Sequence, residues 1–223
     1  MVITMSVKNV KVSASVLNAD LSALGEEVGK VERAGASLLH IDVMDGVFVP
    51  PMTFGDVVTK SLRKKSSLIF DVHLMVKNPE NLIERFAQAG SDMISIHVES
   101  DCDVAGTLAR IRRPGLKAGL AINPSTPIES VYTYLGLADM FIIMSVNPGY
   151  GGQAFIPEST EKIAALRNEA AKRGVPALIE VDGGINENTA PDAVKAGADI
   201  LVAGTYLFNS SDMSKAVESL KNS

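Results

Sequence analysis

The chain has 223 residues, enough for one α/β barrel with a sizeable core, and its 46% hydrophobic and 21% charged residues are typical of a globular protein. A net charge of -5 gives no basic footprint for nucleic acid, and no run of about 18 apolar residues is present to span a membrane. The single cysteine, Cys102, excludes a disulfide framework within the chain, and the N-terminus lacks the pattern of a secretory signal. We therefore expect a cytoplasmic protein whose partner is a small molecule, with no nucleic acid and no membrane.

Short apolar runs rich in β-branched residues alternate with longer segments of helical periodicity. The expected strands span residues 10–16, 37–43, 67–74, 92–98, 116–122, 139–146, 176–182 and 199–204. Segments 20–35 and 159–174 are typical of helices, the first opening with Asp20 as a cap and each ending in glycine. "AGA" or "AGS" precedes the second, fourth and eighth strands, which indicates a repeated helix-to-strand turn. The alternation predicts a (β/α)₈ TIM barrel, a single domain over residues 1–223.

Polar residues are concentrated where the expected strands end, which is where TIM barrels place their chemistry. They include His40, Asp42, His73, His97, Glu99, Asn123, Ser145, Asn147 and Asp182. Because side chains alternate along a strand, His40 and Asp42 share a face, and so do Asp71 and His73. Burying such groups costs several kcal/mol unless they are paired or bind a metal, so this pattern requires an explanation.

A metal site is one explanation. Two imidazoles and two carboxylates, from His40, Asp42, His73 and Asp182, can converge on one divalent cation per chain. Such a mixed nitrogen and oxygen set suits Zn, Fe(II), Mn or Co better than Mg or Ca. The alternative is that the four residues are polar core groups that satisfy one another. His97, beside Glu99, is interpreted as a residue that positions a loop.

Glycine-rich loops follow the last three expected strands, with the sequences "NPGYGG" (147–152), "DGG" (182–184) and "AGTYLF" (203–208). In barrels, backbone N–H groups of such loops, with the start of a short helix, hold a phosphate. A short helix is expected to begin near Thr205. The predicted phosphate grip consists of Gly149, Tyr150, Gly151, Gly152, Gly183, Gly184, Gly204 and Thr205.

The motifs "HIDVMDGVFVP", "FDVHLMV", "NPSTP", "MSVNPGYGGQAFIP" and "EVDGGI" together resemble the ribulose-phosphate 3-epimerase family. The resemblance runs over nearly the whole chain, from "SASVLNADLSALGEE" to "AGADILVAGTYLF". It implies a metal-dependent isomerase of the pentose phosphate pathway that interconverts D-ribulose 5-phosphate and D-xylulose 5-phosphate through an enediolate. It also implies that His40, Asp42, His73 and Asp182 are the metal ligands, and that the two aspartates are the catalytic acid and base.

The resemblance assigns further residues to the substrate. Ser15, His73 and Asp182 would contact it, and Met44, Met75 and Met144 would surround the reacting carbons, although by pattern alone these methionines are core filler. Four positions depart from the usual family residues: Ala14 for proline, Pro51 for asparagine, Tyr150 for phenylalanine and Thr205 for serine. None removes a ligand, an acid or a base. We also expect a homo-oligomer, of a size that the sequence leaves open.

Other functions remain open at this point. The same mechanism would serve a 3-epimerase of a hexulose 6-phosphate such as D-allulose 6-phosphate. A lyase or aldolase acting through a Schiff base needs a lysine at the C-terminal end of a strand, whereas Lys117 begins the fifth expected strand. A non-catalytic protein that binds a metal or a sugar phosphate would not need both Asp42 and Asp182.

Overall fold

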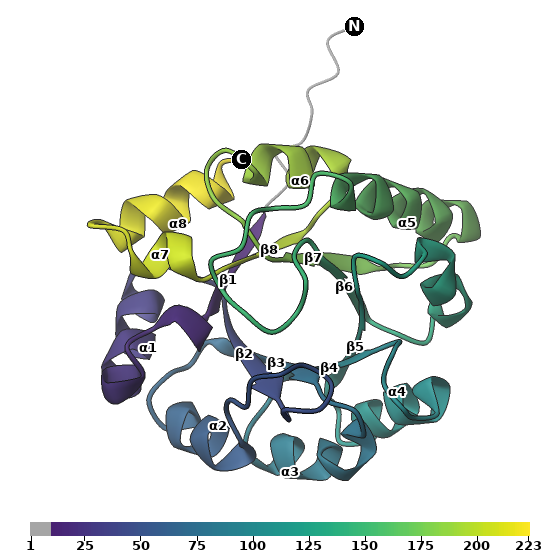
Figure 1. Cartoon of the computed structure of the whole chain (residues 1–223), viewed down its shortest axis with the longest axis horizontal. Coiled ribbons are helices and arrows are strands. Elements are labelled where there is room, and N and C mark those ends of the chain that lie inside the picture. The colour runs from purple at the N-terminus through teal and green to yellow at the C-terminus, as the bar shows by residue number, and fades with distance from the viewer. Residues whose placement is uncertain (1–9) are drawn as a thin grey trace, which may run out of the picture.

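The computed structural model describes residues 10–223, so most of the N-terminal segment in which we expect no secretory signal lies outside the described residues. Parallel strands close into a barrel in the order β1 to β8, surrounded by helices (Figure 1). This topology confirms the predicted TIM barrel. The strands are β1 (Lys11–Ser15), β2 (Leu38–Met44), β3 (Ile69–Met75), β4 (Met93–His97), β5 (Lys117–Ile122), β6 (Met140–Met144), β7 (Leu178–Asp182) and β8 (Ile200–Ala203).

Helices follow most of the strands and cover the outside of the barrel. They are α1 (Leu24–Arg33), α2 (Asp56–Arg63), α3 (Ile83–Gln88), α4 (Val104–Arg112), α5 (Ser159–Arg173), α6 (Ala190–Ala196), α7 (Thr205–Phe208) and α8 (Met213–Lys221). Short 3₁₀ segments lie at Val16–Asn18, Leu21–Ala23, Pro79–Asn81 and Ile128–Tyr134, and the last of these takes the place of an α-helix between β5 and β6. No helix in residues 10–223 is long and apolar enough to cross a membrane.

Local signals in the sequence set the ends of these elements. The side chain of Asp20 accepts a hydrogen bond from Ser22 N–H and caps the 3₁₀ turn that leads into α1. The glycines of the repeated turn, Gly35, Gly90 and Gly197, have φ of +89°, +97° and +122°, a region that glycine enters without steric cost. The repeated tripeptide therefore marks one recurring helix-to-strand connection, as predicted.

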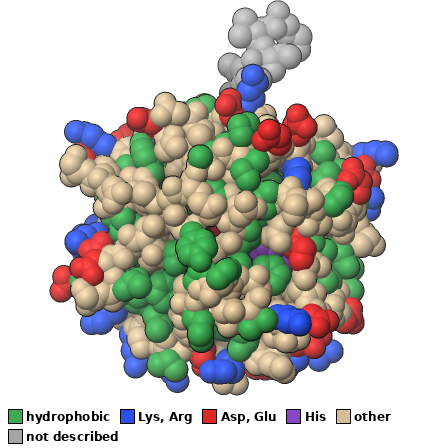
Figure 2. Space-filling view, in the orientation of Figure 1, with side chains coloured by type: hydrophobic (Ala, Val, Ile, Leu, Met, Phe, Trp, Pro, Cys, Tyr) green, Lys and Arg blue, Asp and Glu red, His purple; other side chains and the backbone are tan. Residues whose placement is uncertain are grey.

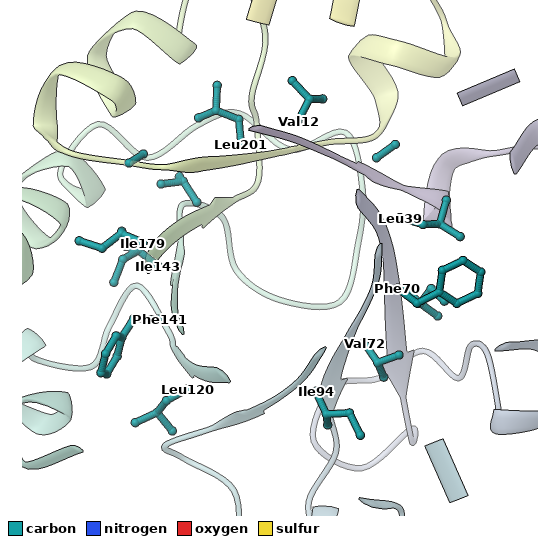
Figure 3. Close-up of a cluster of buried hydrophobic side chains, with 14 of the residues drawn as sticks. Val12, Leu39, Phe70, Val72, Ile94, Leu120, Phe141, Ile143, Ile179 and Leu201 are labelled. Atoms are coloured by element: carbon teal, nitrogen blue, oxygen red, sulfur yellow. The ribbon is translucent and has the colours of Figure 1, made fainter. Parts of the chain in front are cut away.

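Two layers of side chains alternate along the strands. Outward-facing residues such as Leu39, Val72 and Ile143 pack between the barrel and its helices in the main hydrophobic core (Figure 3). Inward-facing apolar residues form a smaller cluster, which includes Ile142 and Met144. The interior also holds fully buried polar residues, unusual for a barrel core, and these lead to the candidate site.

The loop after β2 is held by Asp45. Its Oδ1 accepts hydrogen bonds from Val47 N–H and Phe48 N–H, and its Oδ2 accepts one from Lys77 N–H, all at 2.8 Å. Gly46, the next residue, has a φ of +74°, so the chain turns at Asp45 and Gly46. Hydrophobic side chains gather near the centre of the face seen in Figure 2.

Candidate active site

The predicted metal ligands come together inside the mouth of the barrel. His40 and Asp42 come from β2, His73 from β3 and Asp182 from the last position of β7. His40 and His73 are fully buried, while the side chain of Asp182 is 13% exposed. One ligand atom from each of the four residues lies within 4.8 Å of all the others. The group can therefore hold a metal ion.

The spacing of the donor atoms fits a small divalent cation. His40 Nε2 is 3.4 Å from Asp42 Oδ1 and 3.6 Å from Asp182 Oδ2. His73 Nδ1 is 3.6 Å from Asp42 Oδ1, 3.5 Å from Asp182 Oδ2 and 3.3 Å from His40 Nε2. Ligand atoms at the corners of a tetrahedron with bonds of about 2.0–2.1 Å lie about 3.3–3.4 Å apart. Five of the six distances among the four atoms are thus close to those that a tetrahedral site requires.

The electrostatics of the cluster favour a positive charge at its centre. Burial by itself lowers the pKa of His73, but the adjoining Asp182 and Asp42 carboxylates raise it to about 9. Burial likewise opposes protonation of His40, yet Asp42 and Asp71 hold its pKa well above the usual value. In turn the two imidazoles keep the pKa of Asp42 and of Asp182 below the ordinary range although burial raises it. A bound cation would occupy the point that these carboxylates already make negative.

Beneath the cluster, Asp71 sets the orientation of His40. The Asp71 carboxylate can only accept, so we assign the proton of His40 to Nδ1, which lies 2.8 Å from Asp71 Oδ2. In the neutral ring this leaves a lone pair on Nε2, directed at the other ligands. Glu180 Oε1 is 3.4 Å from the same His40 Nδ1. Burial and the neighbouring Asp71 charge raise the pKa of Glu180 to about 8, which gives this residue a place under the site that the sequence did not suggest.

His97 does more than position a loop. Its Nε2 lies 2.8 Å from Nε2 of His73, and its Nδ1 lies 3.1 Å from Oε2 of Glu99. Burial lowers the pKa of His97 to about 4 and so keeps the ring neutral. The chain contains three histidines, and all of them belong to this one cluster. Sequence reasoning missed the contact because it depends on how β3 and β4 lie against each other.

Ser15, at the end of β1, is also part of the cluster. Its hydroxyl donates a hydrogen bond to Oδ2 of Asp42 at 2.6 Å, and both side chains are buried. The other carboxylate oxygen of Asp42, Oδ1, faces His40 and His73. Ser15 therefore fixes the rotation of the Asp42 carboxylate and leaves one oxygen directed at the ligand cluster.

A cavity of about 1030 Å³ opens above the four predicted metal ligands. Ser15, Asp42 and Asp182 line this cavity. The residues of the predicted phosphate grip line it as well: Gly149, Tyr150, Gly151, Gly152, Gly183, Gly184, Gly204 and Thr205. So do the three methionines predicted near the reacting carbons, Met44, Met75 and Met144. His40 and His73 lie beneath its floor and are not among the lining residues. The volume is at the upper end of the range for small-molecule sites.

The glycine loops are held close together around Asn18, a residue that the sequence analysis did not single out. A Cβ at Gly151 would lie 2.4 Å from Asn18 Oδ1, and a Cβ at Gly204 would lie 2.6 Å from the same atom. At Gly184, with a φ of +65°, a Cβ would lie 2.4 Å from the backbone nitrogen of Phe155. The short helix α7 begins at Thr205, as predicted. Thr205 Oγ1 is buried and has no hydrogen-bond partner within the described chain, which leaves it available to a ligand.

The fold and the site together define a (β/α)₈-barrel enzyme whose candidate active site, at the carboxyl ends of the strands, can hold a metal ion. Lys117 begins β5, at the opposite end of the barrel, and its side chain is 63% exposed. No Schiff-base role follows for it.

Comparisons with known proteins agree with this class. Residues 11–208 match the model of the ribulose-phosphate 3 epimerase family. The chain is 46% identical over 218 residues to a ribulose-phosphate 3-epimerase of Synechocystis sp., an alignment that covers 97% of this chain and 95% of the relative. It is 42% identical over 215 residues to the Bacillus subtilis protein of the same name, with 96% and 99% covered. The chain belongs to the ribulose-phosphate 3-epimerase family.

Solved structures of other enzymes share the fold. A 3-hexulose-6-phosphate synthase superimposes with a TM-score of 0.70 at 18% identity, covering 95% of this chain and 98% of that one. At this level of identity the likeness concerns the barrel alone.

Proposed function

We propose that this chain is an isomerase that interconverts D-ribulose 5-phosphate and D-xylulose 5-phosphate by inverting the configuration at C3. The observation that carries the proposal is the pair of carboxylates at the floor of the cavity. Asp42 and Asp182 each place an oxygen within 3.6 Å of both His40 and His73. The names of the Synechocystis and Bacillus subtilis relatives support this substrate.

The proposal includes one divalent ion per chain, Zn, Fe(II), Mn or Co, held by His40, Asp42, His73 and Asp182. When bound, such an ion supplies Lewis-acid stabilisation of the negative charge that develops on the substrate oxygens. The distances of 3.3–3.6 Å between the two imidazole nitrogens and between each of them and the carboxylate oxygens support the assignment. The hydrogen bond from His40 Nδ1–H to Asp71 supports it further, because it leaves the lone pair of Nε2 directed into the cluster.

Inversion at C3 requires that a proton leave from one face of the carbon and that a proton return to the other. One group cannot do both, so two are needed. β2 and β7 are three steps apart around the closed barrel, which supports a substrate position between Asp42 and Asp182. One aspartate takes the C3 proton to give an enediolate, and the other, protonated, delivers a proton from the opposite side. The reverse reaction exchanges these roles.

The remaining lining residues bind and orient the substrate in this proposal. Backbone N–H groups of the loops after β6, β7 and β8 hold the phosphate, together with the unpartnered hydroxyl of Thr205. Met44, Met75 and Met144 give the cavity an apolar wall at the reacting carbons and keep water from the carbanion. Fixing the phosphate at one end of the substrate fixes the position of C3 between the carboxylates.

A hexulose 6-phosphate such as D-allulose 6-phosphate is the second candidate substrate, because the cavity has room for another carbon. The ratio of kcat/KM for the two sugar phosphates decides between them. We further propose a cytoplasmic location, which is supported by the presence of a single cysteine and thus the lack of an intrachain disulfide. We also propose that the protein is a homo-oligomer.

The experiment that tests the proposed reaction is turnover of D-ribulose 5-phosphate in D₂O. The abstracted proton stays on one aspartate while the other exchanges with solvent, so the D-xylulose 5-phosphate formed should carry deuterium at C3. NMR of the product measures this label. Product without deuterium would show that a single group returns its own proton or that a hydride shifts, and either result rules out the two-aspartate mechanism.

A further inference from the structure

The imidazole of His73 has two partners on opposite sides. Nδ1 faces Asp42 and Asp182, at 3.6 and 3.5 Å. Nε2 faces away from these carboxylates and lies 2.8 Å from Nε2 of His97. The ring centroids of the two histidines are 5.0 Å apart, well beyond the distance between the nitrogens, so the rings meet edge to edge. A hydrogen bond between two Nε2 atoms requires one ring to donate and the other to accept.

Glu99 decides which ring donates. Its Oε2 is 3.1 Å from Nδ1 of His97, and a carboxylate can only accept, so Nδ1 of His97 carries a proton. Its Oε1 accepts from the backbone N–H of Asn123 at 2.8 Å and from the hydroxyl of Thr126 at 2.5 Å. Burial raises the pKa of Glu99, but these hydrogen bonds together hold it below the usual value, so the group remains a carboxylate.

The segment that anchors Glu99 is itself fixed. The ammonium group of Lys162, on α5, donates to the backbone carbonyls of Asn123, Pro124 and Thr126 at 3.1, 2.6 and 2.6 Å. The backbone N–H of Asn123 therefore has a fixed direction toward Glu99. It follows that Glu99 must present an acceptor to Asn123 in any conformation that keeps this segment in place.

We propose that Glu99 and His97 are positioning residues that hold His73 in the tautomer with its proton on Nε2, which leaves the lone pair of Nδ1 free for a metal ion. The inference rests on the metal site of the proposed function and adds two residues to it. Neutral His97, protonated at Nδ1, accepts at Nε2, and His73 must then donate from its own Nε2. Hydrogen bonds of this kind, behind the ligating nitrogen, typically change metal affinity by about 10- to 100-fold.

The variant Glu99→Gln tests which ring nitrogens of His97 and His73 carry protons, because a glutamine has one oxygen and one NH₂ group. Its oxygen must stay on the fixed N–H of Asn123, so its NH₂ group faces Nδ1 of His97 as a donor. His97 then carries its proton on Nε2 and His73 accepts there. The proton of His73 moves to Nδ1, where it blocks the metal. The matched control is Thr126→Val, which removes a hydrogen bond from the same glutamate but leaves the acceptor that faces His97 unchanged.

Two measurements on the full chain are decisive. Long-range ¹H–¹⁵N spectra report the protonated nitrogen of each imidazole, and the chain has only three histidines to assign. Above about pH 9, where the ring of His73 is neutral, we expect the metal-free parent protein to carry its imidazole protons on Nδ1 of His97 and Nε2 of His73, and Glu99→Gln to show the reverse. Competition of Zn²⁺ and Co²⁺ against a chromophoric chelator should show an affinity loss of about 10- to 100-fold in Glu99→Gln and little change in Thr126→Val.

Several results overturn the inference. The opposite tautomers in the parent protein would do so without any variant, which matters if Glu99→Gln fails to fold. An unchanged metal affinity in Glu99→Gln, or an equal loss of affinity in Glu99→Gln and Thr126→Val, would show that the direction of the hydrogen bond between His97 and His73 has no specific effect on metal binding. A parent protein that binds neither ion refutes the metal site of the proposed function instead. The spectra then still decide the proton order.

Discussion

The hydroxyl of Ser15 donates a 2.6 Å hydrogen bond to Oδ2 of Asp42 across the interface between β1 and β2. Hydrogen bonds to charged groups contribute about 1.5–3 kcal/mol, so Ser15→Ala should lower kcat by about 10- to 100-fold through a loosened carboxylate. Ser13→Ala is the matched control, because Ser13 lies on the same face of β1 and its hydroxyl has no hydrogen-bond partner within residues 10–223. Steady-state kinetics of both variants check the prediction, and equal rates for Ser15→Ala and the parent would refute it.

The two proposed proton-transfer groups can be separated by amide substitution. Asp42→Asn and Asp182→Asn should each lower epimerisation by at least about 10²-fold, since each lacks one of the two required groups. Exchange of the C3 hydrogen with solvent can persist in either variant for the sugar phosphate that its remaining aspartate deprotonates. Because both aspartates are proposed ligands, the bound metal is measured first, and only variants that keep their ion are compared. A variant that keeps its ion and full epimerisation would remove that aspartate from the mechanism.

Removal of the metal should abolish activity. A strong chelator is expected to inactivate the protein. Titration with Zn²⁺, Fe²⁺, Mn²⁺ or Co²⁺ should restore activity at one ion per chain, because His40, Asp42, His73 and Asp182 form one set of four metal-donor residues at the mouth of the barrel. His73→Ala should weaken the binding of that ion sharply, since no neighbouring donor replaces Nδ1. Metal analysis together with the assay checks both statements. Full activity in thoroughly metal-free protein would contradict the metal site.

The phosphate grip predicts a specific effect of Gly151→Ala. The added Cβ would lie 2.4 Å from Asn18 Oδ1, so either the Asn18 side chain, which lies against both Gly151 and Gly204, or the loop after β6 must move. Turnover of D-ribulose 5-phosphate should fall in both kcat and kcat/KM, whereas the poor turnover of unphosphorylated ribulose should hardly change. Gly25→Ala is the control, because its Cβ has an ordinary 4.0 Å contact in helix α1. An equal loss on both sugars would place the phosphate elsewhere.

Acid should loosen the loop after β2 through Asp45. Burial is the largest single influence on its pKa and raises it, but the hydrogen bonds from Lys77, Phe48 and Val47 N–H together bring the pKa below the usual value. A carboxyl whose pKa is lower in the folded state stabilises the fold above its unfolded pKa, and this stabilisation is lost as the pH falls through the folded value. Hydrogen exchange at Val47 and Phe48 should therefore become less protected relative to the barrel strands below about pH 4. Asp45→Asn should lack this pH dependence.

Much of the fold could be predicted from the sequence because its signals are local. Each strand lies within two residues of its predicted bounds at either end, with the largest differences at Ile69–Met75, Met140–Met144 and Leu178–Asp182. Alternation along β2 by itself places His40 and Asp42 on one face, and the glycines of the turns must have φ values that other residues avoid. The four proposed metal ligands and the glycines that line the cavity could also be picked out from the sequence, since both stand at strand ends.

Contacts between strands depended on the tertiary structure. The register of β3 with β4 pairs His73 with Ser95, and His97 lies further along its strand, yet the two imidazoles are hydrogen bonded. The contact of Ser15 with Asp42 and the approach of Gly151 and Gly204 to Asn18 likewise join elements far apart in the chain. Side-chain alternation is a property of one strand. Which side chains meet across strands depends on register, tilt and closure of the barrel, and these follow from the packing of the whole chain.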